Sequence, residues 1–177
     1  GKILAFEKTT GTTIWQIEDK NYRPLSIWND LLLMSTYEGN IMALDKRTGK
    51  TVWSYQLKGN PGEMTVSEKG IFVDEYNNGN YIHTLYSVNP DTGQLNWKFN
   101  TRGRVFASPT MVNSALYIGS NDGRFYEIEP KTGHLTGFFQ AAERITNKIA
   151  YNEKTKKFFL PTFANEIYCL TRKEMLA

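Results

Sequence analysis

The side chains that most often carry chemistry are few and widely spaced in this 177-residue sequence. Its two histidines, His83 and His134, lie 51 residues apart, and neither has an acidic or cysteine neighbour at metal-ligand spacing. We therefore predict that both are ordinary core or surface histidines. Cys169 is the only cysteine and lies in the apolar stretch EIYCL, which excludes an internal disulfide and predicts a buried, unreactive thiol.

Other signatures of catalysis are equally weak. Asp122 lies in SNDG, where Asp-Gly is typical of a tight hairpin turn, so we assign it no calcium ion. No glycine-rich phosphate loop is present. The sequence therefore predicts no catalytic residue, no metal ligand and no cofactor.

Charge and hydropathy exclude several partners. The formal charge is only +3, and Lys and Arg alternate with Asp and Glu, which argues against nucleic acid. The densest basic cluster, Lys154, Lys156 and Lys157, is predicted to be a solvated hairpin tip. No apolar run approaches the ~18 residues of a transmembrane helix, so we expect no membrane span. The chain opens directly on a strand-like run, GKILAF, without a signal peptide, which suggests an excised piece of a longer protein.

Four Thr-Gly pairs divide the chain into periods that must position any functional side chain. They begin at Thr10, Thr48, Thr92 and Thr132, so the intervals are 38, 44 and 40 residues. A period near 40 predicts a solenoid or a propeller. The apolar segments within each period are short and bounded by Gly, Asn, Asp or Pro, which indicates strands rather than helices.

Each period contains four strand-like segments joined by turn residues. The first segments are 24–30, 63–70, 107–114 and 147–154. The second are 31–36, 71–76, 115–120 and 157–163. The third are 2–7, 40–45, 81–88, 124–129 and 165–170, and the fourth are 13–18, 51–57, 95–99 and 135–139. We therefore predict an all-β fold, a β-propeller of four-stranded antiparallel blades with about four to five repeats. We expect one domain over 1–177, with repeats near 1–20, 21–60, 61–101, 102–142 and 143–177.

A recurring motif joins the third and fourth segments. Its fullest copy is ALDKRTGKTVW, from Ala43 to Trp53. Gly permits the turn backbone, the acid accepts hydrogen bonds from turn amides, and Trp offers a large apolar face. The pattern resembles the tryptophan-docking motif of the pyrroloquinoline-quinone-like (PQQ-like) β-propeller repeat family, and it decays in the last copy, where Gly137 replaces Trp. We expect structural docking by Ala5, Glu7, Gly11, Trp15, Ala43, Asp45, Thr48, Gly49, Trp53, Asn89, Gly93, Trp97, Thr132 and Gly133.

The resemblance implies a function class. Assembly-scaffold and sensor members of the family are non-catalytic, occur in bacterial envelopes or as appended sensory domains, and bind proteins, so we expect a scaffold or sensor domain in the periplasm or outside the cell. The alternative is a fragment of a PQQ-dependent quinoprotein dehydrogenase, or the propeller half of a larger enzyme. The dehydrogenases would require an Asp base, calcium ligands and often adjacent cysteines, and this chain has no cysteine pair. We therefore expect no quinone cofactor.

Ring closure stays open at this point. The family's propellers usually carry seven or eight blades, about twice this chain. The chain is part of a larger ring, a small closed ring, or a half-ring that pairs with another copy, and we rank an open or partial propeller ahead of a closed one. Exposed blade edges would favour self-association.

One face of the predicted propeller is the candidate binding surface. In a meander propeller, the connections from second to third strands and from one blade to the next share one face, away from the Thr-Gly turns. Tyr and Arg are enriched at interface hot spots. We therefore predict a rim that binds a protein or peptide, formed by Tyr22, Tyr37, Tyr76, Arg102, Arg104 and Arg144.

Overall fold

The computed structural model describes residues 1–18, 25–77 and 80–176, and it consists of small antiparallel sheets that follow one another along the chain. The first pairs β1 (Lys2–Phe6) with β2 (Thr13–Glu18). The second contains β3 (Ser26–Trp28), β4 (Leu31–Ser35), β5 (Asn40–Asp45) and β6 (Thr51–Gln56). The third contains β7 (Asn60–Ser67), β8 (Gly70–Asn77), β9 (Asn80–Val88) and β10 (Leu95–Thr101). Tyr22 of the predicted rim lies outside the described residues.

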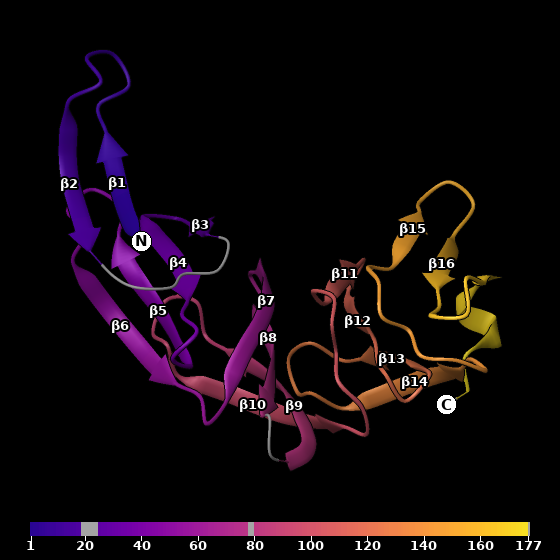
Figure 1. The fold of residues 1–177 in the computed structure, drawn as a ribbon. Helices are drawn as coiled ribbons and strands as arrows, with labels where there is room; N and C mark the ends of the chain where they lie inside the picture. Colours follow the sequence, from indigo (N-terminus) through magenta and orange to yellow (C-terminus); the bar gives the residue numbers. More distant parts are fainter. Residues whose placement is uncertain (19–24, 78–79, 177) are drawn as a thin grey trace.

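Two more sheets complete the described chain. The fourth contains β11 (Thr110–Val112), β12 (Ala115–Gly119), β13 (Arg124–Ile128) and β14 (Leu135–Gln140). The fifth contains β15 (Ala150–Asn152), β16 (Lys157–Pro161) and β17 (Ile167–Leu170), and the short 3-10 helix η1 (Arg172–Glu174) follows it. The sheets stand along an open arc with the two termini at opposite ends (Figure 1). The prediction of an all-β, open or partial propeller of four-stranded antiparallel blades is confirmed.

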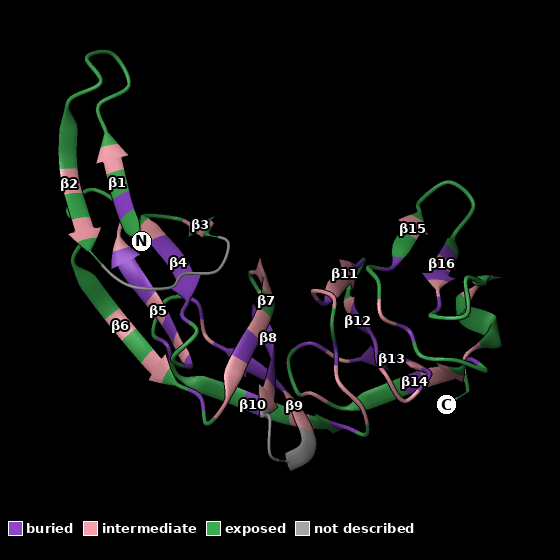
Figure 2. Ribbon diagram, viewed as in Figure 1, coloured by how far each residue is buried: buried purple, intermediate pink, exposed green. Residues whose placement is uncertain are grey.

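The core lies between the sheets, and strand alternation explains it. Successive side chains of a strand point to opposite faces, so one strand serves two neighbouring sheets. Leu32 and Met34 of β4 face the first sheet and pack with Ile3, whereas Leu33 faces the third sheet and packs with Ile71. The middle strands of the second, third and fourth sheets are therefore buried on both faces, while β6, β10 and β14 on the outer side of the arc are largely exposed (Figure 2).

The Thr-Gly turns take the conformation that their residue types predict. Gly49 has φ +71°, in the region that favours glycine, and its N–H donates to the Asp45 carbonyl at 2.8 Å. Asp45 Oδ1 accepts hydrogen bonds from the Thr48 N–H at 2.8 Å and the Thr48 hydroxyl at 2.9 Å. The Thr48 N–H and hydroxyl together lower the pKa of Asp45. The acid, the Thr and the Gly thus form one local unit.

Cys169 corrects one prediction, because its thiol is exposed rather than buried. Cys169 pairs with Phe159 across β16 and β17, on the face opposite to Leu160 and Leu170. Only the face with Leu160 and Leu170 joins the core shared with the fourth sheet. Apolar neighbours in sequence therefore did not predict burial in a sheet that is packed on one side.

The other minor predictions agree with the structure. Lys154, Lys156 and Lys157 are exposed at the β15–β16 hairpin, as expected for a solvated tip. His134 is exposed and His83 is half-buried. In the described part of the chain, no helix is long and apolar enough to cross a bilayer.

Candidate functional site

Three junctions between successive sheets share one arrangement. A Cβ built on Gly133 would come 2.6 Å from the indole of Trp97, so the ring lies directly on the turn backbone. The Trp97 Nε1–H donates to the Pro130 carbonyl at 2.9 Å. The two equivalent sets are Trp15 with Gly49 and the Lys46 carbonyl (3.1 Å), and Trp53 with Gly93 and the Pro90 carbonyl (3.2 Å). These contacts support the docking role that we propose for the motif.

The fourth junction, between the fourth and fifth sheets, is built differently. Tyr117, Glu127 and Gly137 pair side by side across β12, β13 and β14, where the second sheet has Leu33, Ala43 and Trp53. Glu127 is only 2% exposed, and it accepts hydrogen bonds from Arg172 Nε at 2.9 Å and Nη2 at 2.6 Å. An ion pair between a buried glutamate and an exposed arginine therefore occupies the place where the motif has a small residue and a tryptophan.

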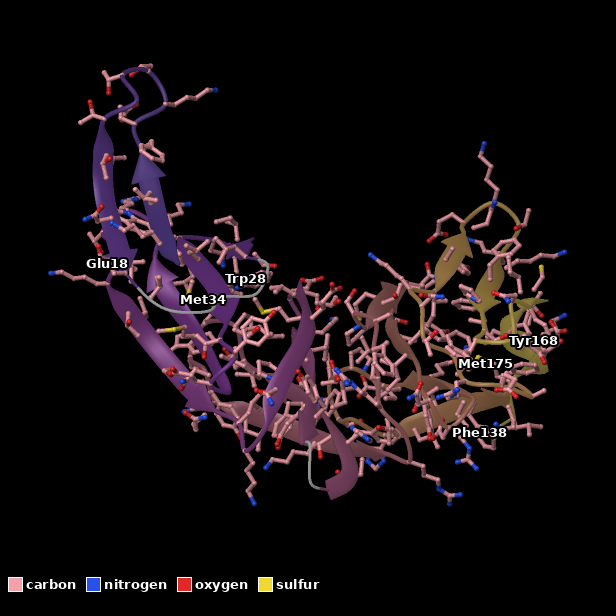
Figure 3. The ribbon with its side chains drawn as sticks, viewed as in Figure 1. Glu18, Trp28, Met34, Phe138, Tyr168 and Met175 are labelled. Atoms are coloured by element: carbon pink, nitrogen blue, oxygen red, sulfur yellow. The ribbon has the colours of Figure 1, made fainter. Side chains whose placement is uncertain are left out.

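Large and small residues are exchanged at the same junction. Leu170 in the fifth sheet is equivalent to Leu44 in the second, because Leu170 pairs with Phe158 as Leu44 pairs with Leu32. Met175, five residues after Leu170, therefore corresponds to Gly49, five residues after Leu44. A Cβ on Gly137 would lie 3.7 Å from the Met175 Cβ. The Phe138 and Leu176 backbones also exchange two hydrogen bonds, of 2.8 and 2.7 Å. Phe138, Tyr168 and Met175 lie at this end of the arc (Figure 3). A different set of contacts thus holds the junction at which Gly137 replaces the tryptophan of the motif.

The predicted rim is assembled in part around Arg104. Its guanidinium carbon lies 3.8 Å from the ring centroid of Tyr76, on the preceding sheet, and 4.3 Å from that of Phe106. Such stacking on two aromatic faces is a favourable cation–π arrangement. Arg104 forms no ion pair among the residues that the structure describes. The rim therefore presents a positive charge that is held by aromatic rings rather than neutralised by a carboxylate.

Arg144 repeats this arrangement one sheet further on. Its guanidinium lies 4.3 Å from the ring centroid of Phe163, and its carbonyl accepts the Phe163 N–H at 2.9 Å. The Arg104 carbonyl accepts the Asn121 N–H at 2.8 Å in the same way. The two arginines thus hold corresponding positions, each tied to the turn after the second strand of its own sheet.

Two further residues of the predicted rim, Tyr37 and Arg102, are described and exposed. Tyr37 is 48% exposed in the β4–β5 turn, and Arg102 is exposed before β11.

Phe106 and Phe163 were missed by the sequence analysis. Phe163 and Tyr37 occupy equivalent positions in the turn after the second strand of their sheets. In both turns the preceding threonine donates its N–H to the carbonyl four residues further on, Thr36 to Asn40 and Thr162 to Glu166. Comparing this turn position between periods would have identified Phe163.

The pKa of His83 reflects the positive charge of the neighbouring Arg104. Burial first, and the charge of Arg104 second, lower the pKa of His83. The His83 Nδ1 is buried and has no hydrogen-bond partner among the described residues. His83 is therefore a neutral neighbour of the Arg104 cluster at pH 7, rather than a second cation.

Among the described residues, the donor side chains do not form a metal site. Within the described ranges, no three His, Cys, Asp or Glu side chains gather in a way that could hold a metal ion. The single Cys169 is also on the outer face of an end sheet. We therefore derive no chemistry through a quinone.

Comparison with known proteins fits this geometry. The sequence profile of the family described as outer membrane protein assembly factor BamB matches residues 1–174. The chain belongs to this family. The BamB of Legionella pneumophila (strain Paris) is 27% identical over 161 residues, which cover 82% of this chain and 40% of that protein.

Solved structures show the same fold. BamB from Moraxella catarrhalis superposes with a TM-score of 0.79 at 18% identity, over 99% of this chain and 54% of that one. The quinohemoprotein alcohol dehydrogenase from Comamonas testosteroni gives a TM-score of 0.78 at 14% identity, over 98% and 39%. At these identities the likeness concerns the fold alone. This BamB-family chain spans only about half the length, or less, of these relatives.

Proposed function

We propose that this BamB-family chain is a non-catalytic scaffold segment that binds a protein or peptide partner through its rim. The observation that carries the proposal is the guanidinium of Arg104, held between Tyr76 and Phe106 from two sheets. A partner that supplies a carboxylate and an apolar side chain would complement this cluster, and Arg and Tyr at such positions are typical of interface hot spots.

The family membership gives the proposal its setting. The Legionella relative is named an outer membrane protein assembly factor. We propose that the longer protein containing this chain acts in the assembly of outer-membrane proteins, on the periplasmic side of the envelope. The partner would then be a protein of that assembly process.

Site-specific photo-crosslinking in the full-length parent protein tests the rim. A photoreactive phenylalanine analogue at Phe106 or Phe163 should capture one partner, identified by mass spectrometry, whereas the same analogue at exposed Val52 on β6 should not. Replacing Arg102 and Arg144 together by glutamate should reduce the captured fraction about tenfold, as expected for two screened charge contacts of roughly 0.7 kcal/mol each.

A matched charge change on the opposite face is the control. Lys50 and Lys131 are exposed beside the Thr-Gly turns, and their replacement by glutamate changes the net charge by the same amount. This control should leave the captured fraction unchanged. Equal losses in the two double variants, or no loss in the rim variant, would rule out the rim as the binding surface.

The alternative, a segment of a quinoprotein enzyme, makes a separate prediction. Incubation with pyrroloquinoline quinone and calcium would then give stoichiometric uptake, visible in the absorbance of the desalted protein. We expect no uptake, since the described donor set does not form a metal site.

Exposed apolar faces on the end sheets support a second binding mode, self-association. Phe6 is 56% and Ile14 is 55% exposed on β1 and β2, and Ile167 of β17 is 69% exposed. Contacts between such faces, or between open strand edges, would give a sedimentation mass that rises with concentration. A strictly monomeric particle over a hundredfold range of concentration would exclude this mode.

A further inference from the structure

A pocket of about 360 Å³ opens beside the fourth junction, between the fourth and fifth sheets. This volume lies within the range of small-molecule sites, roughly 300–1,000 Å³. Three aromatic side chains line it, those of Tyr117, Tyr151 and Phe158. The pocket is separate from the rim, because its other walls come from the β11–β12 and β15–β16 hairpins and from residues 171–173.

The aromatic walls favour a flat ligand. The ring centroids of Tyr117 and Phe158 are 4.6 Å apart, and those of Tyr151 and Phe158 are also 4.6 Å apart. Tyr117 and Phe158 are fixed in the core, since they are only 3% and 2% exposed. The rings are tilted by 46° and 41°, and an aromatic ligand can extend this cluster at the half-buried Tyr151 with the offset or edge-to-face geometry that aromatic pairs prefer.

Cationic side chains surround the mouth of the pocket. Lys156, Arg172 and Lys173 line it, and no carboxylate is among its described lining residues. Lys156 forms an ion pair with Glu153 at 2.9 Å, but both side chains are about two-thirds exposed, so this pair is weak. Arg172 is paired with Glu127, and Lys173 forms no ion pair among the described residues, so Lys173 leaves a net positive charge next to the aromatic floor.

Glu127 positions Arg172 without filling the pocket. Its buried carboxylate accepts bonds from Nε and Nη2 of Arg172, which leaves the remaining N–H groups of the guanidinium for another acceptor. Burial first, and then the charge of Glu127, raise the pKa of Tyr117. Glu127 thus orients the Arg172 guanidinium, and oriented donors bind anions at a lower entropic cost.

We propose that this pocket binds a small aromatic carboxylate, with its ring against Tyr151 and Phe158 and its carboxylate on Arg172 and Lys173. The proposal does not depend on the rim or on the proposed scaffold function. Anion binding in this pocket would explain why the Glu127–Arg172 pair replaces the tryptophan contact at the fourth junction and at no other described junction.

Nuclear magnetic resonance titration of the ¹⁵N-labelled chain tests the proposal. The probes are indole-3-acetate and 2-naphthoate, and the matched controls are their neutral carboxamides. The acids should give saturable shifts at the amides of Tyr117, Tyr151 and Thr171. The carboxamides should bind at least about tenfold more weakly, because they cannot form charge-assisted hydrogen bonds with Arg172.

Variants separate binding from folding. Arg172→Gln should weaken binding of the acids at least about tenfold, but it also leaves Glu127 without its partner. Lys173→Gln and Tyr151→Ala leave that ion pair intact and should each weaken binding about threefold or more, whereas Lys148→Gln, at an exposed position outside the pocket lining, should not. Equal binding of acids and carboxamides, unchanged affinity in both Lys173→Gln and Tyr151→Ala, or no saturable shifts would overturn the proposal.

Discussion

Replacing Gly133 by alanine tests whether the indole of Trp97 requires a bare backbone beneath it. Gly11 provides the matched control, because the two glycines occupy the same kind of turn, with φ of +75° and +71°. An alanine in this left-handed conformation costs roughly 1–2 kcal/mol at either position. At Gly11 the new Cβ would meet no atom within 4 Å, so strain is the whole effect.

At Gly133 the new methyl group would also displace the indole. Its Cβ would come 2.6 Å from the ring, whereas carbon atoms in contact are about 3.5–4.0 Å apart. Moving the ring sacrifices part of the roughly 3–5 kcal/mol that removal of a buried tryptophan costs. We therefore expect Gly133→Ala to lower the free energy of unfolding by about 3–4 kcal/mol, about 2 kcal/mol more than Gly11→Ala.

Urea unfolding followed by circular dichroism measures both variants, and a double-mutant cycle with Trp97→Ala isolates the contact. In the Trp97→Ala background, Gly133→Ala should cost only about 1–2 kcal/mol, so the coupling energy is about 2 kcal/mol. The comparison requires an unchanged dependence of the unfolding free energy on urea. An equal cost of Gly133→Ala in both backgrounds would refute the docking role of the motif.

Three further predictions concern single residues. Trp97→Ala should lower the free energy of unfolding by roughly 3–5 kcal/mol, since Trp97 is 8% exposed, and a loss below about 1 kcal/mol in urea unfolding would contradict docking. Hydrogen bonds from the backbone and hydroxyl of Thr48 lower the pKa of Asp45, so the contribution of this turn to stability is present above pH 3.8 and is lost as the pH falls through the lower, folded pKa. The carboxyl ¹³C titration of Asp45 should therefore have a midpoint below 3.8, and Thr48→Ala should raise it. Burial and then the charge of Arg104 lower the pKa of His83, so protonating it destabilises the folded state as the pH falls below 6.5. Its ring proton titration should have a midpoint below 6.5 that rises in Arg104→Gln, and a midpoint at or above 6.5 would disagree with the structure.

The sequence predicts much of the fold because the signals are local. Asp45, Thr48 and Gly49 interact within one turn, and the same residue types recur at almost the same interval. A four-stranded meander joins neighbours in sequence, so the strand order follows from the turns alone. Sequence spacing was therefore enough to predict strands, turns and sheet architecture.

The less predictable features depend on which sheet faces which. Glu127 and Arg172 are 45 residues apart, and nothing in their local sequence indicates that they meet. The exposure of Cys169 depends on which face of its sheet is packed, which an apolar neighbourhood does not reveal. Arg104 and Tyr76 were assigned to one face from topology, but their stacking distance came only from the structure.

The fourth junction, between the fourth and fifth sheets, bears on how the array of sheets unfolds. Each junction joins only consecutive sheets, so the molecule resembles a one-dimensional chain of coupled units, in which the weakest coupling decides where unfolding begins. Three couplings add a tryptophan contact to an apolar core, whereas the fourth adds the Glu127–Arg172 ion pair to the apolar core that contains Leu160 and Leu170. Salt therefore screens only the ionic part of the coupling that holds the end unit β15–β17, while its apolar part responds to salt as the other junctions do. In amide exchange, this end unit would behave as its own foldon.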